Sequence, residues 1–239
     1  MSFVVPAHNE EQLLGATLEA IHRAAAAVGI DYELIVVDDA STDRTAEIAR
    51  TAGARIISVD HRQIAGTRNS GARAATGGLL VFVDADTIIN TRVLSTTIAA
   101  INGGAVGGGA VLTFDDPMPW SARALAAIVR AGMLAATFAA GAYLFCTAAA
   151  FERTGGFDET LFASEELTLS RALRKVGPVV ILREPVLTSG RKARTHGFRE
   201  LWAPIWLILR YGPSALRDRA HMSLWYGHRR RDPRESGRS

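Results

Sequence analysis

Residues 79–87 of the chain read LLVFVDADT. Five consecutive apolar residues predict a buried strand. The run ends in Asp84 and Asp86, and a strand interior cannot hold unpaired charges, so both must lie where the strand leaves its sheet. Two carboxylates without Cys or His beside them suit a hard divalent cation, Mg²⁺ or Mn²⁺, whose shell is completed by water and substrate phosphates. We therefore expect a metal site at the end of this strand.

Composition indicates a soluble globular protein in a reducing compartment. The chain has 239 residues, of which 48% are hydrophobic and 21% charged, the ordinary range for a globular domain. Its one cysteine, Cys146, excludes an internal disulfide framework. Residues 1–6 lack the basic and apolar regions of a secretory signal. We expect a cytoplasmic protein.

Charge is distributed unevenly along the chain. Residues 1–190 carry 15 Lys and Arg against 20 Asp and Glu, a net of −5, and residues 191–239 carry 12 against 4, a net of +8, which sum to the overall +3. The basic excess is therefore a feature of the C-terminal segment. Such a segment faces phosphates, anionic lipid or nucleic acid, or is a solvated tail; of these, we predict no nucleic-acid partner.

Residues 131–151 have no charge and are long enough to cross a bilayer. They are rich in Ala and Gly and poor in Leu, Ile and Val, so their hydropathy is weak. Gly141 divides them into the end of a helix and a strand over 142–147. We interpret the stretch as protein interior.

Strand and helix patterns alternate through the first half. Strands are predicted at 2–5, 33–37, 55–59 and 79–83, and helices after Asn9 as a capping residue, at 43–51 and at 64–75. This alternation predicts an α/β fold with a mostly parallel central sheet and helices on both faces. The polar residues 6–10, 38–41 and 84–86 each follow a strand, so we expect them to meet in one crevice at the same edge of the sheet.

These segments resemble the family-2 glycosyltransferases. The resemblance rests on residues 4–11, 36–43 and 81–86, on 66–71 before the third segment, and on 155–159, 165–166 and 173–177, which extend it to about residue 192. It implies a GT-A nucleotide-sugar-binding fold, a hexosyltransferase activity with inversion at the anomeric carbon, a nucleotide-sugar donor and a divalent cation. UDP-sugar is the donor that the resemblance suggests, while sugar and acceptor stay open.

The resemblance also implies roles for individual residues. The donor-binding set is Pro6, Ala7, Glu10, Asp38, Asp39, Arg68, Asp84, Arg191 and Lys192. Within it, Pro6, Ala7 and Glu10 would line the nucleoside pocket, Asp39 would accept a hydrogen bond from the base with Arg68 beside it, and Asp84 would lie near ribose and metal. Asp86 would ligate the metal directly. The alternative for Asp38, Asp39 and Asp84 is a role as turn formers or helix caps.

The second half carries a candidate general base. A strand is predicted at 106–114, where three glycines indicate close approach of a ligand or another backbone, and a helix at 120–138.

Ser164 is expected to cap a helix that runs to residue 175. In the family register Glu166 is the base that takes the acceptor proton, with Glu165 as the second candidate. The alternative is that both acids only favour a helix N-terminus.

Residues 187–192 read LTSGRK and resemble the Thr-Ser-x-Arg-Arg segment of smaller, non-processive relatives. The Gln-x-x-Arg-Trp motif of processive members is absent. Cations at Arg191 and Lys192 suit a departing diphosphate, and a solvated basic loop is the alternative.

Residues 201–231 mix Trp and aliphatic side chains with Arg. They are interpreted either as a helix on anionic lipid, serving a lipid-linked acceptor, or as one packed on the domain or on a second subunit in a homodimer. The tail from about residue 230 is expected to be disordered.

The sequence thus predicts one GT-A domain over 1–190, with a nucleotide-sugar half (1–112) and an acceptor and base half (113–190), followed by the basic segment 191–239. The predicted function is metal-dependent, inverting sugar transfer to a hydroxyl or phosphate. The alternatives are a sugar-phosphate nucleotidyltransferase, against which the loop 6–10 argues because it lacks a Gly-x-Gly-x-Arg stretch, and a non-catalytic nucleotide or lipid-surface binding module.

Overall fold

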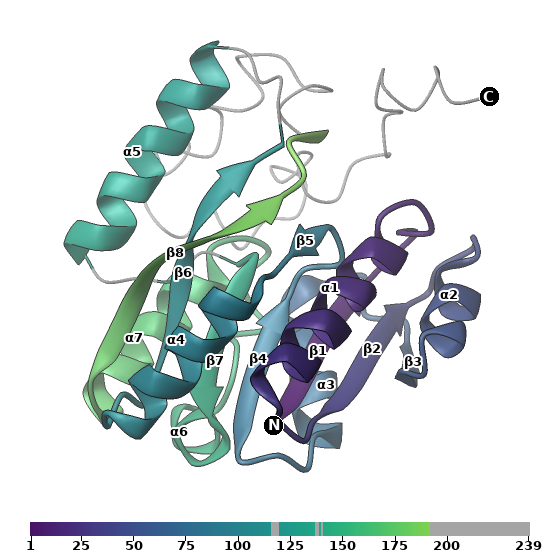
Figure 1. Ribbon diagram of the computed structural model, residues 1–239, viewed down its shortest axis with the longest axis horizontal. Coiled ribbons are helices and arrows are strands. Elements are labelled where there is room, and N and C mark those ends of the chain that lie inside the picture. Colours follow the sequence, from purple (N-terminus) through teal and green to yellow (C-terminus); the bar gives the residue numbers. More distant parts are fainter. Residues whose placement is uncertain (116–119, 137–138, 140, 192–239) are drawn as a thin grey trace.

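A computed structural model describes residues 1–115, 120–136, 139 and 141–191, and its centre is one eight-stranded sheet (Figure 1). The strands lie in the order β3-β2-β1-β4-β7-β6-β8-β5. They are β1 (Ser2–Ala7), β2 (Glu33–Asp39), β3 (Arg55–Val59), β4 (Leu79–Val83), β5 (Thr87–Ile88), β6 (Gly107–Phe114), β7 (Tyr143–Thr147) and β8 (Val179–Thr188). Position 112 falls inside β6, so the two predicted halves of the domain share one sheet.

The first four strands form the predicted parallel half. β1 pairs in parallel with β2 and with β4, and β2 pairs in parallel with β3. Their carboxyl ends therefore meet at one edge, where the loops after β1, β2 and β4 emerge. The predicted α/β fold with a mostly parallel sheet is confirmed for this half.

In the second half two strands, β7 and the short β5, run opposite to the others. β7 lies antiparallel between β4 and β6, and β6 then pairs in parallel with β8. β5 is a two-residue strand antiparallel to the end of β8, with Thr87 opposite Thr188. This pairing brings the chain just after Asp86 against the end of β8, more than 100 residues later.

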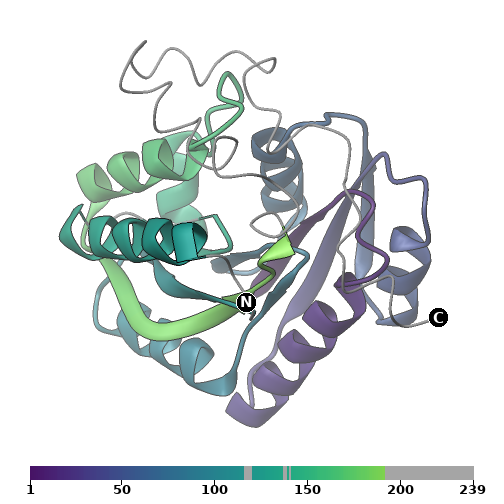
Figure 2. The same cartoon turned by 90° about the horizontal axis from the view of Figure 1, so that it is seen from above.

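Helices cover both faces of the sheet (Figure 2). One face packs on α1 (Leu14–Val28), α2 (Thr45–Thr51) and α4 (Thr91–Asn102), and the other on α3 (Ile64–Ala74), α6 (Ala148–Thr154) and α7 (Glu165–Val176). Successive strand residues alternate between the two cores, since Phe3 and Val5 join the first and Val4 joins the second. Both faces of the parallel half are buried, because its strands carry apolar side chains on both sides.

Two predicted helix caps differ in the structure. Helix α1 begins only at Leu14, and Asn9 has a left-handed φ of 52° and accepts a hydrogen bond from Thr42 N–H instead. Ser164 precedes α7 as predicted, but it too is left-handed, with φ 61°, and its side chain makes no capping hydrogen bond. The Asn9 side chain thus joins the loop after β2, whereas Ser164 contacts its own helix through its backbone carbonyl, which accepts from Leu167 N–H.

The glycines of β6 serve another backbone. A Cβ at Gly108 would lie 2.0 Å from the Val180 carbonyl oxygen, and one at Gly109 would lie 2.8 Å from that of Tyr143. Of the two readings of this glycine run, the structure supports close strand packing against β8 and β7.

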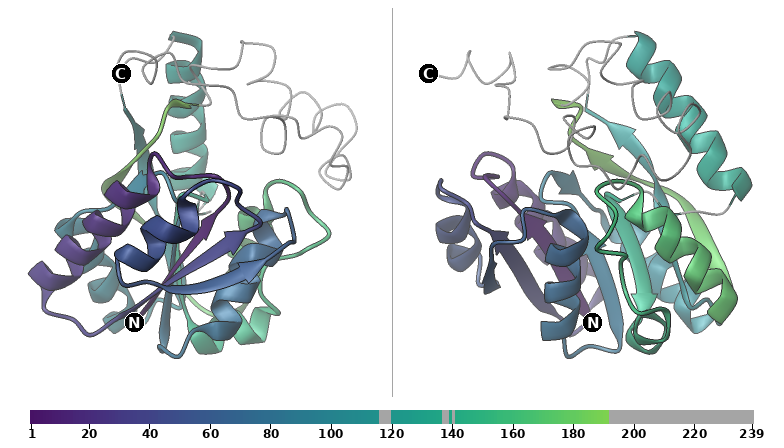
Figure 3. Two further views of the ribbon diagram at one scale, coloured as in Figure 1. Left: turned by 90° about the vertical axis from the view of Figure 1, so that its right-hand side faces the viewer. Right: turned by 180° about the vertical axis from the view of Figure 1, so that it is seen from behind.

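The described part of the uncharged stretch 131–151 contains the predicted helix end and strand, and also the start of a further helix. It holds the end of α5 (Trp120–Ala136), β7 and the start of α6. None of the helices described has both the length and the apolar character needed to cross a membrane. Helix α5 itself stands apart from the layers that flank the sheet (Figures 1 and 3). Predictions for Lys192 and for residues 201–231 and beyond fall outside the described residues.

Candidate functional site

Arg68 is the centre of the polar cluster at the carboxyl edge of the sheet. It lies on α3, is 2% exposed, and donates from Nη2 to Asp84 Oδ1 at 2.7 Å and from Nη1 to Glu165 Oε1 at 2.7 Å. Nη2 also donates to the Gly141 carbonyl at 3.0 Å, and the guanidinium lies 5.4 Å from the centre of the Phe157 ring. Although burial opposes its charge, the two carboxylates raise the pKa of Arg68 further above its ordinary value. One buried cation thus joins the predicted metal strand to the predicted base helix.

Glu166 occupies an environment unlike that of its neighbour Glu165. Its Oε2 is buried without a hydrogen-bond partner, and burial, the adjacent Glu165 charge and a hydrogen bond with the Glu165 carboxyl raise the pKa of Glu166 to about 8 despite the nearby Arg68. Glu165 is instead paired with Arg68. A carboxyl whose pKa is tuned upward toward neutrality has the property expected of a general base or acid.

The residue before α7 has a strained backbone conformation. Left-handed conformations of non-glycine residues are costly and persist where the surroundings enforce them, often at functional sites. Ser164 holds such a conformation directly before Glu165 and Glu166. This left-handed residue directly precedes the two acids, of which Glu165 contacts Arg68.

Asp84 and Asp86 follow β4 in a turn closed by a hydrogen bond from Thr87 N–H to the Asp84 carbonyl. Asp84 keeps 34% of its side-chain area exposed while its Oδ1 accepts from Arg68. Asp86 Oδ1 accepts from the Thr188 hydroxyl at 3.3 Å. The donor set is purely carboxylate and hydroxyl, which fits a hard cation. Within the described part of the chain no three His, Cys, Asp or Glu side chains gather as a metal cluster, so such an ion would need water and phosphate ligands as well.

The Asp39 carboxylate is engaged by the protein. Its Oδ1 accepts from the backbone N–H groups of His61 and Arg62 at 2.7 and 2.8 Å, and its Oδ2 from Gln63 N–H at 3.1 Å and the Thr67 hydroxyl at 2.8 Å. These bonds anchor the loop that leads into α3. This is the turn and capping role that the sequence left open as the alternative.

Asp38, the preceding residue, faces a different environment. It is 8% exposed, and among the described residues its carboxylate has one hydrogen bond, from Ser41 N–H to Oδ1 at 3.3 Å. Asp38 therefore keeps acceptor capacity at the carboxyl end of β2.

Glu10 and Arg191 meet across the site. Arg191 Nη2 donates to both carboxylate oxygens of Glu10 at 3.1 and 3.2 Å, and both side chains are largely buried. Pro6 and Ala7 are the last two residues of β1 and precede Glu10 in the chain. The structure thus brings the first predicted donor segment together with the segment after β8, and Lys192 lies beyond the described residues.

Three residues that were not among the predicted site residues complete the cluster. Thr188 bonds Asp86, Thr67 bonds Asp39, and a Cβ at Gly141 would lie 3.0 Å from Arg68 Nη2 and 3.2 Å from Glu166 Oε1. Thr67 and Thr188 do lie inside the motif segments 66–71 and 187–192. Nothing in the local sequence around Gly141 indicates that it contacts this cluster.

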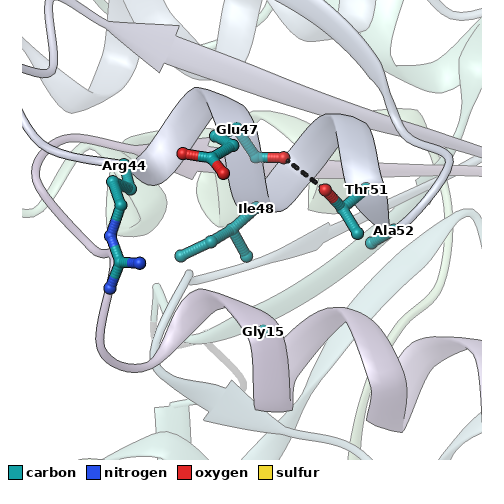
Figure 4. Close-up of a pocket in the computed structure, with 6 residues that line it drawn as sticks. All are labelled: Gly15, Arg44, Glu47, Ile48, Thr51 and Ala52. Atoms are coloured by element: carbon teal, nitrogen blue, oxygen red, sulfur yellow. Dashed lines mark hydrogen bonds between the residues drawn. The ribbon is translucent and has the colours of Figure 1, made fainter.

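A separate hollow of about 270 Å³ lies between α1 and α2 (Figure 4). Its lining residues are Gly15, Arg44, Glu47, Ile48, Thr51 and Ala52. None of the predicted site residues lines it.

Comparisons with known proteins match this architecture. The glucosyltransferase of Streptomyces hygroscopicus that acts on validoxylamine A is 33% identical over 112 residues, which cover 44% of this chain and 26% of that protein. The chain thus spans about a quarter of that relative's length.

Two solved structures share the GT-A-type fold. The mannosyltransferase PcManGT of Pyrobaculum calidifontis, solved with GDP-Man and Mn²⁺, has a TM-score of 0.66 at 20% identity over 91% of this chain and 64% of its own. S. aureus TarS with UDP-GlcNAc has a TM-score of 0.63 at 18% identity over 86% of this chain and 66% of its own. At these identities the likeness shows the fold alone.

The family model described as glycosyl transferase family 2 matches residues 2–154, more than half of the chain. This span holds the three strand-end loops and the Arg68 helix. The chain belongs to glycosyl transferase family 2.

Proposed function

We propose that the protein is an inverting, non-processive glycosyltransferase that moves a sugar from a nucleoside diphosphate to an acceptor hydroxyl or phosphate. The observation that carries this proposal is the buried Arg68, which holds Asp84 on one side and the Glu165–Glu166 pair on the other. Donor-binding carboxylates and a proton acceptor are thereby placed around one fixed cation. The domain 1–190 carries this whole arrangement.

Glu166 is the proposed base. Its raised pKa and its partnerless buried oxygen suit a group that accepts a proton from the acceptor as its oxygen attacks the anomeric carbon. Glu165 is held by Arg68, so its role is to fix the guanidinium and to raise the pKa of Glu166 by its charge. This division favours Glu166 over Glu165 for the reaction itself.

Asp86 and Asp84 are the proposed ligands of a divalent cation. Their carboxylates fit Mg²⁺ or Mn²⁺, and the presence of Mn²⁺ with GDP-Man in PcManGT supports a divalent cation in this protein. When bound, such an ion offsets the charge that develops on the departing diphosphate. Thr188 and the β5–β8 pairing hold Asp86 in place through the side chain and the backbone.

Asp38 is the proposed contact to the nucleoside base, in place of Asp39. Among the described residues, the Asp39 carboxylate already accepts four hydrogen bonds, whereas that of Asp38 accepts one. Glu10 holds Arg191 at the same edge, where a guanidinium suits a diphosphate in fork geometry. Uracil and guanine both stay open as the base, since the neighbouring structures bind UDP-GlcNAc and GDP-Man.

The experiment is isothermal titration of the protein with nucleoside diphosphates, with and without Mn²⁺. We expect tight binding only with Mn²⁺, and loss of that binding in Asp86→Ala. Asp31→Ala is the matched control, because Asp31 is an exposed carboxylate beyond the opposite end of the sheet. Equal affinity with and without Mn²⁺, or in Asp86→Ala and wild type, would rule out the metal assignment.

A further inference from the structure

Two of the three large apolar side chains that are exposed in the described part of the chain lie on one helix, α5. Among the described residues, the large apolar side chains that are exposed are Trp120 at 80%, Ile128 at 56% and Leu187 at 42%. The first two lie on α5, and the third lies near the end of β8, which pairs with β6 just before α5 begins. Apolar groups gathered in this way mark an interaction surface.

The exposed residues described on α5 form one face. Successive residues of an α-helix turn by about 100°, so the positions whose side chains are described as exposed fall within an arc of about 160°. Trp120 and three alanines form its centre, Ile128 one margin, and Arg123 and Arg130 the other; the alanines are Ala124, Ala127 and Ala131. Met133 points away from this arc and is 1% exposed. We call these seven exposed residues the α5 face.

The positive charge of the α5 face favours a negatively charged binding partner. Residues 120–136 contain two Arg and no Asp or Glu. A second copy would present the same positive charges, and residues 192–239 carry 11 Lys and Arg against 4 Asp and Glu, so both are electrostatically poor partners. An anionic lipid surface has the opposite charge and also accepts Trp and Ile into its interfacial region.

We propose that the α5 face binds the surface of an anionic lipid bilayer. The apolar centre would enter the headgroup region while Arg123 and Arg130 stay among the phosphates, the arrangement of an interfacial amphipathic helix. At 17 residues, α5 is about 25 Å long and lies flat on such a surface rather than crossing it.

The chain connects this face to the carboxyl edge of the sheet. Asp115 accepts a hydrogen bond from Gly190 N–H, next to Arg191 and its partner Glu10. Five residues later Trp120 begins α5, so its Cα lies within about 18 Å of that of Asp115. Docking of α5 would therefore hold the polar cluster close to the bilayer. The inference itself does not depend on the proposed reaction.

The test is sedimentation of the full chain with vesicles of phosphatidylcholine, with and without phosphatidylglycerol. We expect binding to the anionic vesicles that weakens as salt rises. A basic residue at an anionic surface contributes a factor of about five, so Arg123→Gln/Arg130→Gln should weaken binding by about twentyfold or more. Trp120→Ser/Ile128→Ser should weaken it as well, because the apolar anchors are lost.

The matched control is Arg50→Gln/Arg153→Gln, which removes two exposed charges from α2 and α6. All these positions are exposed, and circular dichroism melts should show that each variant folds. The proposal is overturned if wild type ignores anionic vesicles, if the α5 variants bind like wild type, or if the control loses as much. Conversion of a dimer to a monomer by Trp120→Ser/Ile128→Ser, without vesicle binding by wild type, would assign the face to a second copy instead.

Discussion

Replacing Glu166 with Gln should change how the stability of the protein depends on pH. Glutamine keeps the shape of the side chain but stays neutral at every pH. In the wild type, the pKa of this carboxyl rises from 4.5 to about 8 on folding, mainly through burial. Its protonated form therefore favours the folded state, with the full contribution present below pH 4.5 and lost as pH rises through 8.

The size of the effect follows from the shift. At about 1.4 kcal/mol per pKa unit, a rise from 4.5 to about 8 corresponds to an upper limit of about 5 kcal/mol. Glu166 is half-buried, so solvent relaxation around the ionised carboxylate reduces this to about 2–3 kcal/mol. The free energy of unfolding of wild type should fall by this amount, relative to Glu166→Gln, between about pH 5 and about pH 8.5.

Urea unfolding followed by circular dichroism measures the difference. Glu152→Gln is the control, since Glu152 is exposed on α6, and it should track the wild type across the pH range. Sugar transfer in a single turnover should meanwhile fall by about 10²–10⁴-fold in Glu166→Gln, with donor affinity retained. Parallel pH curves for wild type and Glu166→Gln would refute the reasoning, because the carboxyl would then be ordinary in the folded protein.

Three further substitutions test the cluster. Asp39→Asn should lower the free energy of unfolding by about 3 kcal/mol, because backbone N–H groups lose a charged acceptor, while nucleotide affinity per folded molecule stays constant; normal stability with weak nucleotide binding would restore Asp39 to the donor site. Arg68→Lys should cost about 3 kcal/mol in urea unfolding, since a point charge cannot hold both Asp84 and Glu165 in fork geometry; an unchanged midpoint would show that the fork is dispensable. Gly141→Ala should slow single-turnover transfer by about 10²-fold by displacing the Glu166 carboxyl, with Gly78→Ala, where a Cβ has open space, as the silent control; equal rates in both variants would separate Gly141 from the reaction.

The first half of the fold could be predicted because each strand is a short apolar run followed at once by polar residues. The strands predicted at 55–59 and 79–83 have the same bounds in the structure, and β1 and β2 extend two residues further than predicted. The position of β7 could not be predicted in the same way. Its residues 143–147 are apolar whichever neighbours they have, and antiparallel insertion between β4 and β6 depends on contacts distant in sequence.

The sequence predicted which residues belong to the candidate site, but not which of them contact one another. Asp38 and Asp39 are adjacent and of the same type, so no local pattern could tell which one would anchor α3. The loop at 61–63 decides this, because its N–H groups converge on Asp39. Similarly, Arg68 was placed beside Asp39, whereas the structure pairs it with Asp84 and with Glu165, 97 residues away.

Residues at the start of α3 and within it hold the segment 155–166 in place. Asn69 donates to the Phe157 carbonyl and accepts from Phe157 N–H, both at 2.9 Å. Gln63 donates to the Leu161 carbonyl at 3.0 Å, and Arg68 reaches Glu165. Three side chains of one region thus hold the loop that ends at Glu166.

This arrangement separates two requirements of the proposed reaction. The carboxyl edge of the parallel strands sets where the donor carboxylates lie, while α3 and the loop it holds set where Glu166 lies. Arg68 is the contact between the two, with Asp84 on the strand side and Glu165 on the helix side. This nearly fully buried cation fixes Asp84 relative to Glu165, since both accept hydrogen bonds at 2.7 Å from the same guanidinium, and Glu166 follows Glu165 directly in the chain. The geometry of transfer therefore depends on α3 as much as on the residues that touch the substrates.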